Sequence, residues 1–268
     1  MEKKGINRDS NSYTFIYASA LVILVAALLA VAAVGLKPFQ DKNASIAKKI
    51  DILKSVGIES TAADAEEKYE TFVKETYIIN AAGATQKGDA FNVDLANEVK
   101  KEVKDRQLPV YECKIEDGSV KYILPVRGKG LWGPIWGYVA VNDDKNTIFG
   151  ATFGHKGETP GLGAEIEKES FQAQFQDKKV IKDGKVTFIV AKGGAKPGDE
   201  YAVDAISGGT ITCKGVEAML LECLSAYSVF LSDDSVAVQN QELATDSITN
   251  GAAVTDSISA EAIVTDSI

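Results

Sequence analysis

The segment Tyr138–Phe153, YVAVNDDKNTIFGATF, holds two apolar runs separated by a short polar stretch. The runs are Tyr138–Val141 and Thr147–Phe153, and both are rich in the β-branched and aromatic residues that favour strands. Asn142–Asn146, NDDKN, lies between them and has the composition of a turn. The pattern predicts an antiparallel β-hairpin.

Strand and helix signals continue on both sides of this hairpin. Further short strands are expected at Tyr77–Ala81, Tyr122–Val126 and Val186–Val190. Apolar residues at helical spacing predict helices at Ala44–Val56, Asp64–Glu75 and Lys214–Leu231. Helices mixed with antiparallel strands predict one α+β domain over residues 37–231.

An uncharged apolar segment precedes this domain. Residues 13–36, YTFIYASALVILVAALLAVAAVGL, are long enough for the roughly 20 residues that cross a hydrocarbon core. A cleaved signal peptide has a shorter apolar region, so we predict a single transmembrane helix after an N-terminus at residues 1–12. Lys37-Pro38 ends the apolar run. Basic residues lie on both sides of it, so charge alone leaves its orientation open.

The charge is unevenly spread along the 268 residues. The chain has 29 Lys and Arg against 38 Asp and Glu, a formal net charge of -9, and most of the excess lies in residues 232–268, which hold no basic residue. These residues repeat Thr-Asp-Ser-Ile, and their composition predicts a disordered tail. An acidic chain does not favour bulk capture of nucleic acid. His155 is the only histidine, which excludes a metal site built on several imidazoles, and no metal is predicted.

Two glycine-containing stretches are candidates for a ligand site. Gly128–Tyr138, GKGLWGPIWGY, combines glycines that allow close backbone approach with the two tryptophans, Trp132 and Trp136, whose rings offer stacking faces. A turn with both tryptophans in the core explains the same residues, and composition favours it. His155–Glu165, HKGETPGLGAE, predicts a tight loop whose amides could surround a ligand. It lacks the glycine order of a dinucleotide-binding fingerprint.

A third stretch, Asp204–Thr212, DAISGGTIT, runs into the helix expected at Lys214. A hydroxyl at a helix N-terminus lies among free amides, an environment that suits an anion such as phosphate. Capping of the helix by Ser207, Thr210 or Thr212 is the more common use of these residues.

In this order, and after one apolar segment, the three stretches resemble the C subunit of the bacterial sodium-translocating NADH:quinone reductase. The resemblance covers about residues 13–231 and includes KIDILKSVG at residues 49–57. Ser207-Gly208-Gly209-Thr210, with Asp204 three residues ahead, is similar to the family's S-G-A-T flavinylation motif. Gly209 stands where the family has alanine.

The resemblance implies an FMN-binding domain in which a flavin transferase attaches FMN to Thr210 through a phosphoester, with the phosphate at a helix N-terminus. It implies a loop against the flavin ring, with Trp132 or Trp136 nearby and Lys192 as a partner for phosphate or flavin. Glu158, Glu165 and Asp204 are candidates for carboxylates that orient loops, although a solvated surface position is the favoured interpretation for Glu165. The remaining cofactor-binding residues implied are Asp204, Ser207, Gly208, Gly209, Thr159, Gly161, Leu162 and Gly163.

The function implied is electron relay through FMN during NADH-to-quinone transfer coupled to sodium export. The chain would be one component of the enzyme, with the other subunits, the transferase and membrane lipid as partners. It would cross the bacterial inner membrane once and place its domain on the outer side. Two alternatives remain: the G subunit of the Rnf-type electron-transport complex, and a non-redox, membrane-anchored flavin-binding or sensory module.

Overall fold

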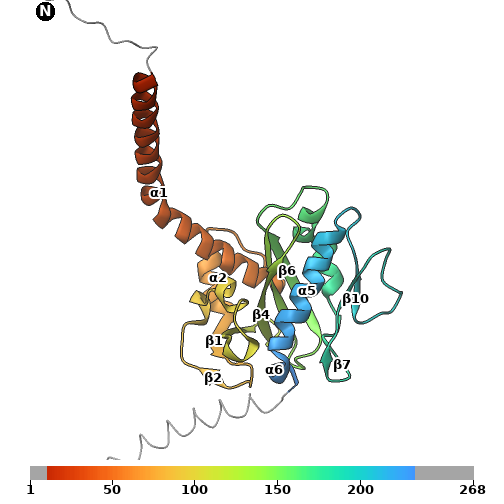
Figure 1. Cartoon of the computed structure of the whole chain (residues 1–268). Helices are drawn as coiled ribbons and strands as arrows, with labels where there is room; N and C mark the ends of the chain where they lie inside the picture. Colours follow the sequence, from red (N-terminus) through yellow and green to blue (C-terminus); the bar gives the residue numbers. More distant parts are fainter. Residues whose placement is uncertain (1–10, 233–268) are drawn as a thin grey trace, which may run out of the picture.

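A six-stranded antiparallel sheet forms the centre of the computed structural model, which describes residues 11–232 (Figure 1). The strand order is β2-β1-β3-β4-β5-β6. The strands are β1 (Val73–Ile79), β2 (Thr85–Gln86), β3 (Leu108–Lys114), β4 (Val120–Lys129), β5 (Pro134–Val141) and β6 (Ile148–His155). The predicted hairpin is confirmed as β5 and β6, where Val139 lies opposite Ala151. The predicted tail, residues 232–268, lies outside the described residues except for Ser232. Residues 1–10 of the predicted N-terminus also lie outside them.

The strand predicted at Val186–Val190 is instead divided between two small sheets. Its start belongs to the hairpin of β7 (Ile181–Lys182) and β8 (Lys185–Val186). Its end belongs to β9 (Ile189–Ala191), which pairs in parallel with β10 (Ala202–Asp204). The division arises because the Thr187 amide donates to Val180 while the Ile189 amide donates to Tyr201.

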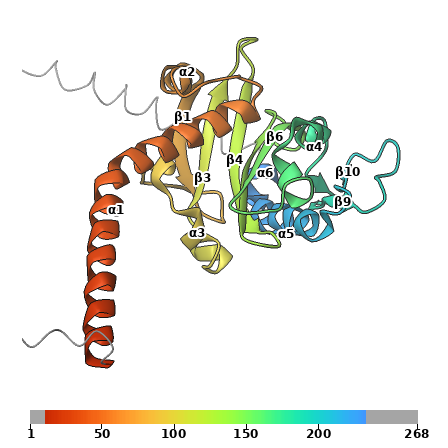
Figure 2. The ribbon, with the colours of Figure 1, turned by 90° about the horizontal axis from the view of Figure 1, so that it is seen from above.

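Helix α1 (Asn11–Ser55) joins the apolar segment to the domain without a break. It contains both the predicted span and most of the predicted helix at Ala44–Val56, so Lys37-Pro38 ends the apolar run but not the helix. Figures 1 and 2 show that α1 changes direction part-way along its length. Pro38 accounts for a bend, because it lacks an amide proton and its ring displaces the preceding carbonyl. The first part of α1 is long and apolar enough to cross a membrane, and its side chains are exposed.

Helices cover both faces of the sheet (Figure 2). The second half of α1 and the short α2 (Ala65–Phe72) cover one face, where Ile52 packs with Tyr111 and Tyr138. Helix α5 (Thr210–Ala226) covers the other face, where Val216 and Leu220 join the larger core. Because side chains alternate along β5, Ile135 and Val139 face α5 while Trp136 and Tyr138 face α1.

Close backbone contact fixes α5 on β4. A Cβ atom built on Gly215 would lie 2.4 Å from the Lys129 carbonyl oxygen, so only glycine allows the helix to lie this near the strand. The helix predicted at Lys214–Leu231 begins earlier, at Thr210, and is interrupted at Tyr227, after which α6 (Ser228–Ser232) follows. The Tyr227 hydroxyl donates to the Pro109 carbonyl at 2.8 Å, which ties the end of α5 to β3.

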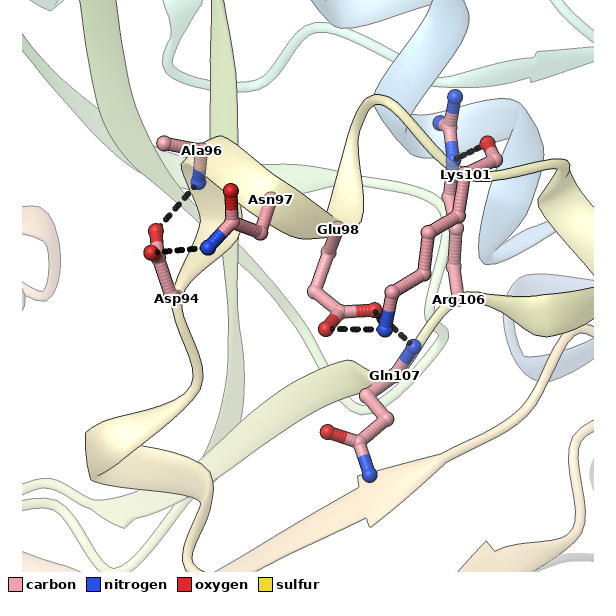
Figure 3. Close-up of polar contacts among 7 residues, drawn as sticks. All are labelled: Asp94, Ala96, Asn97, Glu98, Lys101, Arg106 and Gln107. Atoms are coloured by element: carbon pink, nitrogen blue, oxygen red, sulfur yellow. Dashed lines mark hydrogen bonds and ion pairs between the residues drawn. The ribbon is translucent and has the colours of Figure 1, made fainter.

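Polar contacts order the segment before β3 (Figure 3). Arg106 of this segment also reaches α5. Asp94 caps α3 (Leu95–Glu98), and the buried Glu98 accepts from the Lys101 ammonium and the Gln107 amide. The buried Arg106 donates to the Lys101 carbonyl and pairs with Glu222 of α5 at 2.7 Å. The short elements not yet placed are η1 (Ala90–Asn92), η2 (Val103–Asp105), η3 (Gly163–Glu167), α4 (Glu169–Gln172) and η4 (Ala173–Phe175).

Candidate functional site

A cavity of about 220 Å³ lies at the N-terminus of α5. Each of the three glycine-containing stretches lines part of it: the β4–β5 turn, the loop after β6 and the start of α5. The predicted site residues that line it are Trp132, Thr159, Leu162, Gly163, Gly208, Gly209 and Thr210. The sequence therefore predicted which segments meet, although they are far apart in the chain.

The first turn of α5 presents a hydroxyl that is not used for capping. Gly209 occupies the N-cap position, and no side chain caps the helix. Thr210 is the first helical residue and is partly exposed at the cavity. The alternative in which Ser207, Thr210 or Thr212 caps the helix is therefore wrong. The first amides of a helix have no intrahelical acceptor, so this turn can receive an anion.

Thr212 differs from Thr210 in its surroundings. Its side chain is buried, and its hydroxyl donates to Glu158 Oε2 at 2.5 Å. A Cβ atom on Gly163 would lie 2.3 Å from the Thr212 hydroxyl oxygen, so the loop after β6 closes over this hydroxyl. Of the two threonines, only Thr210 has a hydroxyl without such a cover.

Glu158 connects all three segments of the site. Its side chain is 4% exposed, and besides Thr212 it accepts from the Trp132 amide at 2.8 Å and from the Gly133 amide. Burial raises the pKa of this carboxyl, but the hydrogen bonds from Thr212, Trp132 and Gly133 outweigh it and lower the pKa below its usual value. Glu158 is therefore a buried, ionised group whose oxygens are occupied by donors.

His155 has a hydrogen-bonding role. Its Nδ1 accepts from the Glu158 amide at 3.1 Å, which helps to hold the loop after β6 in place. Within residues 11–232, no group of His, Cys, Asp and Glu gathers to form a candidate metal site.

Apolar side chains surround the mouth of the cavity. Trp132 is 69% exposed, and Leu162 and Ile211 are also exposed. The interpretation that places both tryptophans in the core is therefore wrong for Trp132. Trp136 lies on the opposite face of the sheet, where it lines a groove with Asp51 of α1. Only Trp132 is placed to stack on a ligand at Thr210.

Four predicted site residues do not line the cavity. Gly161 lies in the adjacent loop, where its amide donates to Glu165 Oε1, and Ser207 precedes the lining glycines. Asp204 accepts from the Ala195 amide and so orders the turn that carries the exposed Lys192. Sequence reasoning missed Leu131 and Ile211, because an apolar side chain next to a glycine or threonine carries no chemical signal of its own.

Comparisons with known proteins identify the family. The family model of the FMN-binding domain matches residues 130–225, which include every segment that lines the cavity. The chain is 34% identical to the C subunit of the Na(+)-translocating NADH-quinone reductase of Vibrio vulnificus (strain YJ016), over 79% of this chain and 89% of that protein. The chain belongs to this family of C subunits. It is also 36% identical to the C subunit from Neisseria meningitidis, over 80% of this chain and 90% of that protein.

Solved structures agree with this family and with the fold. The C subunit from Parabacteroides distasonis ATCC 8503 is 43% identical with a TM-score of 0.68, and the match covers 74% of this chain and 98% of that chain. NqrC of Shewanella oneidensis is 27% identical with a TM-score of 0.60, over 70% and 95% of the two chains. The predicted resemblance and the α+β class are confirmed. Among the alternatives, these relatives favour the reductase family over the Rnf-type complex.

The residues present fit FMN. Gly208 has a φ of 76°, and a Cβ atom there would lie 2.5 Å from Leu162 Cδ2, so the backbone forms a close cradle beside Thr210. The helix N-terminus suits the phosphate, and Trp132 with Leu162 suits a planar ring. The cavity is smaller than the roughly 300–1,000 Å³ of pockets that enclose a whole ligand, so part of the flavin would lie over the exposed rim.

Proposed function

We propose that this chain is the covalent-FMN subunit of a sodium-translocating NADH:quinone reductase and relays electrons within that complex. One observation carries the proposal: Thr210, the first residue of α5, lines the cavity and is partly exposed, while the Thr212 hydroxyl is buried against Glu158. The family membership and the match to an FMN-binding domain support the cofactor and the complex.

The proposed bond is a phosphoester between Thr210 Oγ1 and FMN. It would form on a flavin transferase from an activated flavin phosphate, whose leaving group departs as the oxygen–phosphorus bond forms and the hydroxyl proton is released. The amides and dipole of α5 would then stabilise the phosphate charge. A covalent bond would also retain the cofactor in a domain outside the cytoplasm, where we place it.

FMN, when bound, can accept and release electrons one at a time. The residues of this chain would hold and shield it: Trp132 and Leu162 would cover the ring, and Glu158 would fix the turn that carries Trp132. We assign NADH oxidation, quinone reduction and sodium movement to the other subunits. Asp204 and Lys192 would act on the cofactor only indirectly, through the turn that they share.

The apolar part of α1 supports a membrane position, and the family that the chain belongs to supports the outer side. We propose that α1 crosses the bacterial inner membrane once, with lipid around residues 13–36, and that the domain lies on the outer side. The exposed apolar side chains of this part of α1 support contact with lipid or with neighbouring subunits.

Intact mass of the chain, produced together with a flavin transferase, tests the covalent assignment. We expect an FMN-sized adduct on the native chain and on Thr212→Ala, and none on Thr210→Ala. Within the assembled complex, NADH should bleach the flavin absorbance of this subunit in the native enzyme only. If Thr210→Ala keeps the adduct and Thr212→Ala loses it, FMN is attached to Thr212 and not to Thr210.

A further inference from the structure

Glu158 lies in the loop after β6, and its side chain joins the other two segments of the cavity. Its Oε1 accepts from the Trp132 amide in the β4–β5 turn, and its Oε2 accepts from Thr212 in the first turn of α5. Its own amide is held by His155 at the end of β6. The Trp132 amide and Thr212 are 26 and 54 residues from Glu158 in the chain, so this carboxylate joins segments that are distant in sequence.

The contacts around this carboxylate leave little room for adjustment. A Cβ atom on Gly130 would lie 2.6 Å from Glu158 Oε1, and one on Gly163 would lie 2.6 Å from Oε2. Glycines therefore enclose the carboxylate on two sides. Both carboxylate oxygens accept hydrogen bonds, and the surrounding backbone lies against them. The position of Glu158 therefore sets the position of Thr212 on its helix.

Thr212 and Thr210 lie in the same helical turn, so whatever fixes one fixes the other. Gly209 provides no side-chain cap that could hold the turn. The hydrogen bond from the Thr212 hydroxyl to Glu158 holds this turn from the interior of the domain, while Thr210 lines the cavity.

We propose that Glu158 is the positioning residue of the modification site: through Thr212 it holds the first turn of α5 so that the Thr210 hydroxyl is presented for attachment of FMN. This inference rests on the proposed function. Glu158 itself touches neither the Thr210 hydroxyl nor the flavin phosphate in the proposed reaction. Its effect is on geometry, and it acts through one hydroxyl.

The rate of FMN attachment tests the proposal. The full chain in detergent is mixed with a flavin transferase and its flavin donor, and the adduct is followed by intact mass over time. Glu158→Ala removes both acceptor oxygens, and Thr212→Val keeps the shape of the side chain but removes the donor. Each should slow attachment by between about tenfold and about a hundredfold, the range expected when a reacting group is misplaced.

Two further variants separate positioning from general damage to the fold. Thr212→Ser keeps the hydroxyl, so this variant should attach FMN at a rate within about threefold of the native rate. Such a difference is smaller than the effect expected from the loss of a single hydrogen bond. The double variant Glu158→Ala/Thr212→Val should be no slower than the slower single variant, because both changes break the same contact.

Glu98→Ala is the matched control. Glu98 is also a buried carboxylate that accepts from a backbone amide and a side chain, but it lies beside β3, away from the cavity (Figure 3). This variant should unfold at lower denaturant concentration yet attach FMN at the native rate. Attachment at the native rate in Glu158→Ala, or equal slowing in Glu98→Ala, would overturn the positioning role. A native chain with no adduct at all would instead overturn the proposed function, and this inference with it.

Discussion

Two glycines at the cavity differ in what a side chain would meet. A Cβ atom on Gly209 would lie 3.2 Å from both Ile206 Cγ2 and the Leu162 carbonyl oxygen, a tight contact that small shifts can relieve. A Cβ atom on Gly163 would lie 2.3 Å from the Thr212 hydroxyl oxygen. The substitution of glycine for the family's alanine at Gly209 is therefore mild, whereas Gly163 is required for the contact between Glu158 and Thr212.

Alanine at each position should separate these cases. We expect Gly209→Ala to change the free energy of unfolding by less than about 1 kcal/mol, because the lost chain entropy of the unfolded state offsets the tight contact. Gly163→Ala should destabilise by about 1–3 kcal/mol, the usual effect of overpacking, and should slow FMN attachment. Urea denaturation and intact mass measure both effects. Equal behaviour of the two variants would contradict the steric argument.

For single residues, the sequence predicted cavity-lining positions well within the glycine-containing stretches. It predicted them poorly for residues that lie between these stretches. Gly208, Gly209 and Thr210 line the cavity because a few residues of local backbone bring them there. Lys192 does not, because the turn after β9 is ordered by the contact of Asp204 with Ala195. That contact spans nine residues and depends on the pairing of β9 with β10.

At the scale of elements, Asp51 links α1 to β5. Burial raises the pKa of its carboxyl to about 6, with Glu167 adding to the shift and Lys54 and the Trp136 indole opposing it. The folded chain therefore binds this proton more tightly than the unfolded chain, whose Asp pKa is about 3.9. The resulting stabilisation is fully present below about pH 4 and is lost as the pH rises through about 6.

Asp51→Asn should remove this pH dependence, because asparagine still accepts from Trp136 and carries no charge. We expect the variant to be more stable than the native chain at pH 8 by about 2 kcal/mol, after allowance for the partial exposure of the group. The difference should shrink towards zero near pH 4.5. Urea unfolding followed by tryptophan fluorescence at both pH values measures it, and a difference that does not change with pH would rule out Asp51 as its source.

The elements show where sequence patterns succeed and fail. The β5–β6 hairpin was predictable because its apolar runs and turn are adjacent in the chain. The continuation of α1 through Pro38 was not, because a proline normally ends a helix in a sequence pattern, and the prediction therefore separated the span at residues 13–36 from the helix at Ala44–Val56. The split at Thr187 likewise depends on partners elsewhere in the chain.

At the scale of the whole molecule, the side of the membrane that holds the domain is open to direct test. Cys113, Cys213 and Cys223 are free and buried, and burial raises the pKa of Cys113 and Cys223 to about 11, so none should react readily in the folded chain. A cysteine introduced at an exposed position would therefore report its own location.

Lys87→Cys, on the surface of the domain, should react with a membrane-impermeant maleimide in intact cells or in spheroplasts. The matched variant Asn11→Cys, at the start of α1, should react only after the membrane is permeabilised. Labelling is read by the mass of the purified chain. The opposite pattern would place the domain in the cytoplasm and would leave the fold and the flavin site unaffected.

The covalent bond at Thr210 is the central claim, and mapping it on the peptide tests it most directly. Cleavage after lysine releases residues 193–214, because Lys196 precedes a proline, and this peptide contains Ser207, Thr210 and Thr212. Fragmentation of the peptide from the native chain should place the mass of FMN on Thr210 alone. An unmodified peptide, or FMN on Ser207 or Thr212, would contradict the account.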